Sequence, residues 1–323
     1  MRQVTIMSEQ QTRTPESVQR EIKRTRHKAE IPIYIFSSII GPAFLCIMYV
    51  AIFGQYGIVD KIKEGLALAD MTESHPQFNA FLVGFIAVFA ALGAIGFLCY
   101  IIVLQLYNYY KMYADDMCYS IRVTEENYPE IYAKVQEFTK LLGWKKEPEV
   151  YVQQMNGDIN AYASWVPGKR YVHLNAEIVD LVYLEHKDID TISFIMGHEF
   201  GHLYWNHVPL HYNFLANFAK MIPFFGMKII GPLLERAREF TADRVAQALT
   251  DNKSSDKAMM LISGGRHGYK YLNANDYVVS ADKDKNFIEK IARFIVNLFA
   301  DHPIQTLRTK AILDPEKKSG RLL

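Results

Sequence analysis

The 323-residue sequence lacks a strong charge of either sign, because 36 lysine and arginine residues face 35 aspartate and glutamate residues. No block of basic residues is interleaved with aromatic ones, so no nucleic-acid partner is expected. Cysteine is also scarce, and Cys46, Cys99 and Cys118 have no paired spacing. The sequence therefore predicts neither a disulfide framework nor an oxidising compartment.

Charge is missing altogether from two long stretches near the N-terminus. Residues 33–53 are uncharged, and at about 1.5 Å per residue a helix of this length spans the roughly 30 Å of a bilayer core. Residues 78–104 are also uncharged, and their recurring glycine and alanine residues offer a surface for the first span. We expect a transmembrane helical hairpin over residues 33–104, rather than two buried core helices.

Basic residues are distributed unevenly around these two spans. Residues 1–32 contain seven lysine and arginine residues, whereas the loop between the spans contains Lys61 and Lys63 alone. The positive-inside rule then predicts a cytoplasmic tail over residues 1–32 and a cytoplasmic domain over residues 105–323. A cleaved signal peptide is not expected, because the first apolar run begins late and is too long.

Apolar periodicity predicts helices and a few strands in this domain. Helical patterns cover residues 125–142, 176–185, 188–206, 233–250, 284–299 and 303–313. Alternating patterns predict strands at 149–154, 159–166 and 170–175. We expect a linker at 251–257 and a flexible loop at 263–269. Because helices and strands are segregated along the chain, the expected fold class is α+β, mostly helical, with a small β-sheet.

The stretch FIMGHEFGHLYW, residues 194–205, places polar side chains inside an apolar run. His198, Glu199 and His202 fit the pattern H-E-x-x-H, in which residues i and i+4 of a helix can bind one metal ion. Glu199 lies one step round the helix, where it can act as a general base toward water. An ordinary buried helix would leave these groups unpaired, at about 1–3 kcal/mol each. A metal centre is therefore the better explanation.

A third ligand is predicted in RAREFTADRVA, residues 236–246. Glu239 and Asp243 have i, i+4 spacing, so Glu239 can complete a two-histidine, one-glutamate ligand set. Asp243 can accept a hydrogen bond from the outer nitrogen of a ligand histidine, and Arg236 and Arg238 could neutralise the carboxylates. The alternative is a solvated charged face, which is less favoured beside an H-E-x-x-H pattern.

Two further histidines follow the H-E-x-x-H pattern closely. His207 and His211 lie five and nine positions after His202, off the metal-facing stripe, and we do not expect them to be ligands. Catalytic zinc takes three protein ligands and leaves a place for water. We therefore expect one catalytic Zn²⁺ per chain.

These motifs resemble those of the M48 family of membrane-associated zinc metallopeptidases. The matches are HEFGH, the R-x-x-E-x-x-A-D string from Arg236 to Asp243, NAYA at residues 160–163 and HPIQTLR at residues 302–308. They span roughly residues 125–313. The N-terminal hairpin with a cytosolic domain looks most like the HtpX-type proteases, whereas prenyl-protein processing members have more spans.

The resemblance implies a gluzincin-type fold, one zinc ion and hydrolysis of peptide bonds. It also implies an edge strand on which substrate lies, formed by Asn160, Ala161, Tyr162 and Ala163. His302 would lie near the metal, where it could stabilise an oxyanion, although a helix-packing role is a close alternative.

The interval from residue 208 to residue 234 is apolar but interrupted by proline, glycine and lysine. One membrane crossing there would separate Glu239 from His198, and two crossings need about 40 residues. We therefore expect an interfacial or re-entrant hairpin with its lysines at the headgroups. The alternative is a packing segment within a soluble domain.

Together these features predict a membrane-anchored zinc endopeptidase that acts on protein or peptide substrates, membrane proteins among them. The lipid bilayer is an expected partner, and the expected location is the bacterial inner (plasma) membrane, in a multi-pass arrangement. The alternative is a catalytically silent membrane scaffold, against which the intact Glu199 argues. A transporter is not expected, because the two spans contain no intramembrane charge.

Overall fold

The computed structural model describes residues 13–55, 76–185, 187–250, 255–282, 286–300, 302–314 and 320–322. Side chains are not described at 52–55, 76–92, 94, 182, 184, 185 and 282. The loop between the predicted spans, the linker positions 251–254 and most side chains of the second predicted span therefore lie outside the described part.

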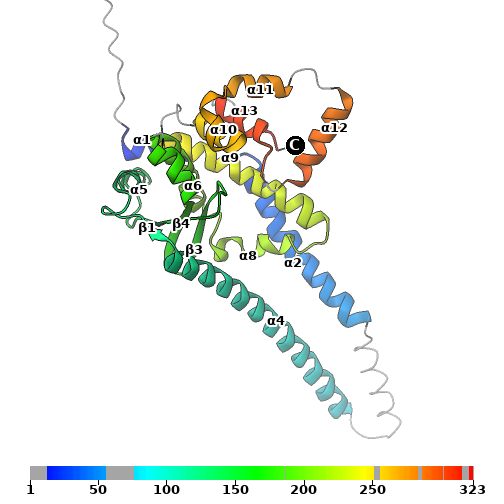
Figure 1. Ribbon diagram of the computed structural model, residues 1–323. Helices are drawn as coiled ribbons and strands as arrows, with labels where there is room; N and C mark the ends of the chain where they lie inside the picture. The colour runs from blue at the N-terminus through cyan, green and yellow to red at the C-terminus, as the bar shows by residue number, and fades with distance from the viewer. Residues whose placement is uncertain are drawn as a thin grey trace, which may run out of the picture.

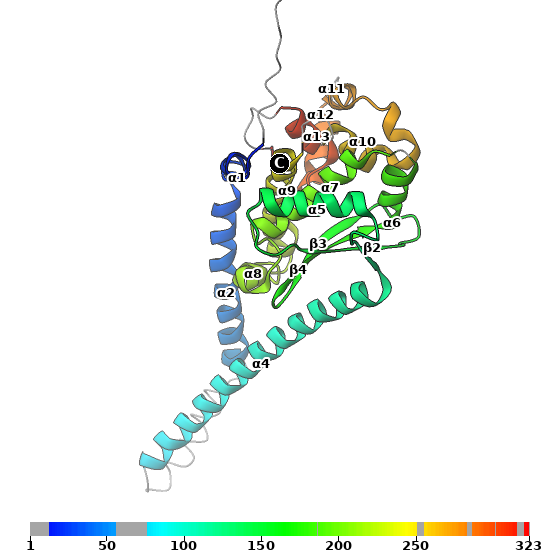
Figure 2. The same cartoon turned by 90° about the vertical axis from the view of Figure 1, so that its left-hand side faces the viewer.

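Two long helices project from one side of a folded body (Figures 1 and 2). Helix α2 (Glu30–Gln55) and helix α4 (Pro76–Tyr119) have 26 and 44 residues. Within the described residues, the segment Glu30–Ala51 of α2 is the one helix long and apolar enough to cross a membrane. The transmembrane hairpin therefore stays a prediction.

Helix α1 (Pro15–Ile22) packs onto the body, which differs from the expected separate tail over residues 1–32. Thr14 caps this helix by accepting a hydrogen bond from the Ser17 backbone N–H at 3.2 Å. Val18 and Ile22 are buried in the main hydrophobic core. Because two apolar residues one turn apart face this core, α1 packs with the body. The bounds of the domain stay a prediction.

The sheet contains strands β1 (Ile121–Arg122), β2 (Glu149–Gln153), β3 (Ala161–Val166) and β4 (Lys169–Asn175) in the order β1-β2-β4-β3. β2 and β4 are parallel, and the other pairs are antiparallel. A two-residue turn joins β3 to β4, with Gly168 at φ +84°, where glycine is favoured. The three predicted strands are confirmed, β1 was not predicted, and β3 is an end strand of this sheet.

The two faces of the sheet are covered by different helices. Val150, Val152 and Val172 point into the main core beneath α5 (Pro129–Leu141) and α7 (Ile189–Tyr204). Tyr151 and Tyr171 point to the other face, against the C-terminal end of α4. This alternation follows from the two-residue period of a strand. The sheet therefore lies between α4 on one face and α7 on the other (Figure 2).

The remaining helices complete the body around α7. They are α6 (Ala176–Ile178), η1 (Val179–Glu185), α8 (Leu210–Ala219), η2 (Gly226–Ile230), α9 (Gly231–Leu249), α10 (Ser255–Gly268), η3 (Tyr269–Tyr271), α11 (Ala274–Asp282), α12 (Phe287–Phe299) and α13 (Gln305–Leu313). The flexible loop expected at 263–269 is wrong, because α10 extends to Gly268. The buried residues Met259 and Met260 anchor this helix, which kinks at Gly265 with φ +72°.

Helices α7 and α9 cross in close contact at the centre of the body. A Cβ atom on Gly201 would lie 3.0 Å from the Ala242 Cα, and one on Gly197 would lie 3.2 Å from the Ala246 Cα. Two glycines four residues apart thus face two alanines four residues apart. This small-residue contact brings the backbones of the two helices together, and with them the side chains predicted to bind metal.

The segment from residue 208 to residue 234 leaves the body along α2 and returns to it. Helix α8 packs on α2, where a Cβ atom on Gly41 would lie 2.4 Å from the Ala219 backbone nitrogen. The chain then turns through η2 into α9. His198 and Glu239 accordingly lie in the same body, and the depth of this segment in a bilayer stays a prediction.

Candidate metal centre

Helix α7 presents two histidines on one face. Asp188 caps its N-terminus by accepting a hydrogen bond from the Thr191 N–H at 3.2 Å. Most of the helix is buried among apolar side chains. His198 and His202 therefore project into a cleft from a helix that is fixed along most of its length.

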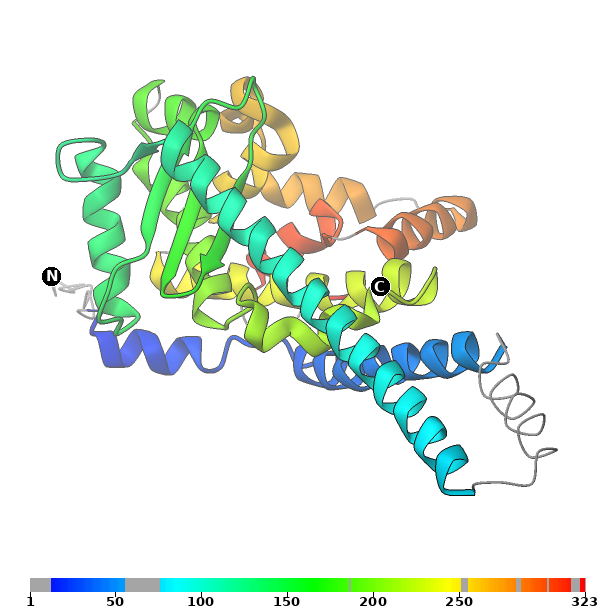
Figure 3. The same ribbon diagram turned by 90° about the horizontal axis from the view of Figure 1, so that it is seen from below.

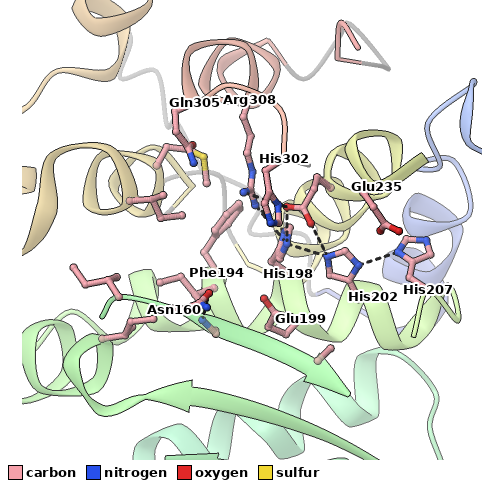
Figure 4. A pocket seen from close by; sticks show the side chains of 18 of the residues that line it. Asn160, Phe194, His198, Glu199, His202, His207, Glu235, His302, Gln305 and Arg308 are labelled. Atoms are coloured by element: carbon pink, nitrogen blue, oxygen red, sulfur yellow. Dashed lines mark hydrogen bonds and ion pairs between the residues drawn. The ribbon is translucent and has the colours of Figure 1, made fainter. Parts of the chain in front are cut away.

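The three predicted ligands, His198, His202 and Glu239, form one cluster that could hold a metal ion (Figure 4). The two histidine Nε2 atoms are 3.1 Å apart. Glu239 Oε2 lies 3.4 Å from His198 Nε2, and Glu239 Oε1 lies 3.3 Å from His202 Nε2. A tetrahedral ion with bonds of about 2.0–2.1 Å separates its ligand atoms by about 3.3–3.4 Å. The triangle therefore has the size that such an ion requires.

The donor chemistry fits a divalent transition metal. Two imidazole nitrogens and one carboxylate make up the ligand set of catalytic zinc peptidases. Glu239 is buried, and the two histidines are buried or partly buried. A metal ion would hold together donor atoms that otherwise face each other across a largely buried site.

The outer side of His198 is held by a carboxylate and a guanidinium. His198 Nδ1 lies 2.8 Å from Asp243 Oδ1, so it can donate its proton and leave Nε2 to bind a metal. Arg308 donates to Asp243 at 2.6 and 2.7 Å and pairs with Glu239 at 3.2 Å. Burial and Arg308 oppose a charge on His198, but Glu239 and Asp243 outweigh them and raise its pKa to about 10.

The outer side of His202 leads to the N-terminal helices. His202 Nδ1 lies 3.0 Å from His207 Nδ1, and His207 Nε2 lies 3.2 Å from Glu30 Oε1. Thr241 and Arg26 also donate to the Glu30 carboxylate. If His202 binds through Nε2, its Nδ1–H donates to His207, whose own N–H then donates to Glu30. Burial lowers the pKa of His207 to about 4, which agrees with the neutral ring that this chain needs.

The two predicted neutralising arginines lie elsewhere. Arg236 donates to backbone carbonyls of Asn297 and Ala300, and Arg238 donates to Asn213. Both side chains thus donate to partners other than Glu239 and Asp243. The predicted neutralising role of Arg236 and Arg238 stays a prediction.

Arg308, on α13, pairs with the carboxylates of Glu239 and Asp243 instead. It lies within the HPIQTLR string, but its role was not predicted, because residue spacing alone does not bring α13 to α9. His207 was likewise not predicted to contact His202. His211 packs beside Trp165, with ring centroids 5.2 Å apart.

A pocket of about 360 Å³ opens over the cluster (Figure 4). Glu199 lines it between the ligand histidines and strand β3. Asn160, Ala161 and Ala163 also line it. Tyr162 instead faces the other side of the sheet, where its ring stacks on His173 and its hydroxyl donates to Asp116 at 2.8 Å. Three of the four predicted edge-strand residues thus border the pocket.

His302 lies at the rim of the same pocket. Its Nδ1 is 3.2 Å from Glu239 Oε2, although 69% of the side chain is exposed. The hydrogen bond to Glu239 raises the pKa of His302. The structure thus brings His302, from the segment before α13, beside the ligand that α9 supplies.

The chain can be compared with known proteins at this point. The profile of Peptidase family M48 matches residues 125–316, which is more than half of the chain. In the same comparison, no curated protein and no solved structure matches the chain. The matched region runs from α5 through α13 and contains His198, His202 and Glu239. The family consists of metallopeptidases, which implies peptide or protein substrates, while the HtpX-type layout stays a prediction. The chain belongs to peptidase family M48.

Proposed function

We propose that this metallopeptidase is a membrane-anchored zinc endopeptidase that cleaves protein substrates, membrane proteins among them. The observation that carries the proposal is the triangle of His198, His202 and Glu239, with Glu199 beside it in a pocket bordered by an end strand. Zinc is the ion that fits best, because two imidazoles and a carboxylate make up a zinc peptidase ligand set.

The mechanism assigns a separate task to each side chain. When bound, zinc lowers the pKa of a water ligand and polarises the scissile carbonyl. Glu199 accepts a proton from the attacking water and later delivers it to the leaving nitrogen. Asp243 keeps the His198 ring in the orientation that directs Nε2 toward the ion. Arg308 balances the two carboxylates, so that the site does not accumulate negative charge.

The substrate backbone would lie against strand β3. β3 pairs with β4 on one side, and its other edge borders the pocket with Ala161 and Ala163. An extended peptide can add to such an edge through backbone hydrogen bonds. These small side chains leave room for a peptide between β3 and Glu199. His302 lies across the pocket, where it could donate a hydrogen bond to the developing oxyanion.

Membrane anchoring is supported by the contacts that precede α2. Helix α1 packs in the core, and Glu30 at the start of α2 contacts both His207 and Thr241. The chain therefore leaves the domain at α2 and returns to it through α4. If α2 crosses a bilayer, α4 must cross back, which makes a two-span protein. The basic residues before α2 favour the cytoplasm for the N-terminus and the domain, as in a bacterial inner membrane.

Replacement of the predicted base tests the proposed chemistry. We expect Glu199→Gln to keep zinc and the folded state but to lower casein cleavage by at least about 10²-fold, because glutamine cannot accept the proton. Purified protein in detergent would be assayed for zinc content and cleavage, with and without a chelator. A matched control is Glu235→Gln, which changes a pocket carboxylate that is paired with Lys220 outside the triangle.

Two results would contradict the proposal. Cleavage that survives in Glu199→Gln would remove the base assignment. Wild-type protein that contains zinc but cleaves nothing would favour the silent scaffold. The Glu199→Gln variant can also retain uncut substrates in cells, so proteins enriched with it relative to wild type would identify the substrate class.

A further inference from the structure

Helix α12 has an unusual arrangement, in which Arg293 and Asn297 are packed inward while its large apolar residues face outward. Asn297 is buried, and its side chain donates to the Leu322 carbonyl at 2.9 Å. Arg293 is half-buried and donates to Thr306 Oγ1 at 2.7 Å. The exposed large apolar residues are Phe287, Ile288, Ile291, Phe294, Ile295, Val296 and Phe299. We call these seven residues the α12 face.

The exposure of this face is large. Phe287 and Ile288 are 77% and 75% exposed, and Phe287, Ile291 and Phe294 recur at three- and four-residue spacing along one stripe. A surface helix of a water-soluble body normally directs such a stripe into the core. The polar side of α12 already makes its hydrogen bonds to the body. Its apolar side therefore needs a covering from outside the body.

The α12 face continues into the turn that precedes η2. The rings of Phe299 and Phe224 lie 6.2 Å apart, and Phe224, Phe225 and Met227 are also exposed. This turn follows α8, which packs on α2, and η2 itself contacts α2. Figure 3 shows α12 and α2 extending toward the same side of the body. The exposed apolar surface thus runs from α12 through this turn to the candidate membrane span.

We propose that the α12 face lies in the headgroup–acyl boundary of a lipid bilayer, beside the point where α2 enters it. This inference rests on the proposed membrane anchoring and adds a second, peripheral contact to it. Figure 1 shows α12 running across the direction of α2, as an interfacial helix does beside a spanning helix. Lys290 and Lys228 are exposed at this surface, where they can reach lipid phosphates.

The contact would also orient the peptidase site. Arg236 of α9 donates to the carbonyls of Asn297 and Ala300 at the C-terminal end of α12. Arg236 precedes the ligand Glu239 by less than one helical turn, and His302 follows α12 closely in the chain. A bilayer-bound α12 therefore fixes the height of the pocket above the membrane, within reach of segments that emerge from it.

The test uses full-length protein reconstituted in lipid nanodiscs. Cys46, Cys99 and Cys118 are replaced by serine, and single cysteines carry an environment-sensitive fluorophore. Ile295→Cys probes the α12 face, and Ile39→Cys probes the exposed side of α2. Tyr271→Cys in η3, which is 90% exposed, is the control outside both surfaces. Nitroxide lipids with the label near the headgroup or near the chain end report depth.

We expect the probe at Ile295 to emit at shorter wavelength and to be quenched more by the shallow nitroxide than by the deep one. The probe at Ile39 should be quenched by lipid nitroxides, and that at Tyr271 by neither. Zinc content verifies that each labelled protein is folded. Quenching at Ile39 without quenching at Ile295 overturns the α12 proposal and leaves the anchor intact.

Other outcomes are equally distinct. A blue-shifted but unquenched probe at Ile295 means that protein covers the face, which overturns the lipid assignment. Loss of that shift at one chain per nanodisc would identify a second copy as the cover. Absence of quenching at both Ile39 and Ile295 overturns the anchoring and this inference together. Zinc-dependent cleavage is measured separately, so the peptidase assignment does not depend on any of these results.

Discussion

At the scale of single residues, the outer nitrogens of two histidines orient the metal site. Asp243 accepts a hydrogen bond from His198 Nδ1, and the His207 ring lies within hydrogen-bond distance of His202 Nδ1. Each contact occupies Nδ1 and leaves Nε2 directed toward Glu239. The two partners differ chemically. Asp243 is a carboxylate paired with Arg308, whereas His207 is a neutral ring that is hydrogen-bonded to Glu30.

The neutral partner can be tested by substitution. We expect His207→Ala to weaken zinc affinity by about 10–100-fold, because the His202 ring would lose the acceptor that fixes its orientation. Zinc affinity is measured by competition with a chromogenic chelator. His211→Ala is the matched control, since His211 packs on Trp165 and should leave zinc affinity unchanged. Equal effects of the two variants would show that the contact with His202 does not matter.

The raised pKa of His198 predicts how zinc binding depends on pH. With its pKa raised to about 10 by the neighbouring carboxylates, the metal-free ring holds a proton at neutral pH. Zinc must displace that proton, so affinity should rise by about tenfold per pH unit as pH increases through neutrality. Calorimetry in buffers of different ionisation enthalpy would count the released protons. A flat pH profile would contradict this prediction.

The sequence predicted site residues that lie a few positions apart on one helix. It did not predict contacts between residues that are far apart in the sequence. His198 and His202 follow from a helical repeat, and Asp243 follows from its position one turn after Glu239. Arg308 contacts His198 across 110 positions, and Glu30 contacts His207 across 177 positions. No local pattern carries such pairings, because they depend on how separate helices pack.

At the scale of elements, the crossing of α7 and α9 sets the distance between the ligands. Gly197 and Gly201 face Ala246 and Ala242, so the two backbones approach closely. Glu239 lies one turn before this contact on α9, and His198 and His202 lie on α7 beside the two glycines. The G-H-E-F-G order thus combines the packing surface and the ligands in one stretch of helix.

A larger side chain at this crossing should open the site. In Gly201→Val the new Cβ would lie 3.0 Å from Ala242 Cα and Val245 Cβ. Such overpacking costs about 1–3 kcal/mol, and we expect both a lower melting temperature and weaker zinc binding. The control Gly268→Val adds the same atoms where nothing lies within 4 Å. Normal zinc binding by Gly201→Val would show that the helices tolerate separation.

The predicted elements differ from the observed ones where contacts with other parts of the chain determine whether a segment forms a helix or a strand. The alternating strands and the long helices were predicted within a few residues, because the spacing of their apolar residues repeats over several positions. The glycine-rich end of α10 was taken for a loop, although its preceding turns contain Met259 and Met260 in the core. Strand β1 has two residues and exists through its pairing with β2, so its own sequence carries too little signal.

At the scale of the whole molecule, zinc should add to stability without being required for the fold. Glu239 and Asp243 are both paired with Arg308, so the metal-free site retains a partner for each carboxylate. We expect a chelator to lower the melting temperature while the protein stays folded. Zinc at about 100 times its dissociation constant would restore about 2.7 kcal/mol.

The ligand dependence of this shift can be checked by scanning calorimetry. Glu239→Gln should melt at the same temperature with and without zinc, because its amide is a poor substitute for the carboxylate ligand. Glu235→Gln should keep the zinc-dependent shift. A zinc-dependent shift in Glu239→Gln would place the ion elsewhere in the molecule.

The N-terminal contacts of the body have a consequence for biosynthesis. Glu30 leaves the ribosome early, yet its partner Thr241 follows 211 positions later. The hydrogen-bonded chain from Glu30 through His207 to His202 can close only after residue 207 has been synthesised. A chain that ends before Glu239 therefore has an incomplete metal cluster, and the site can form only after α2, α7 and α9 have all been synthesised.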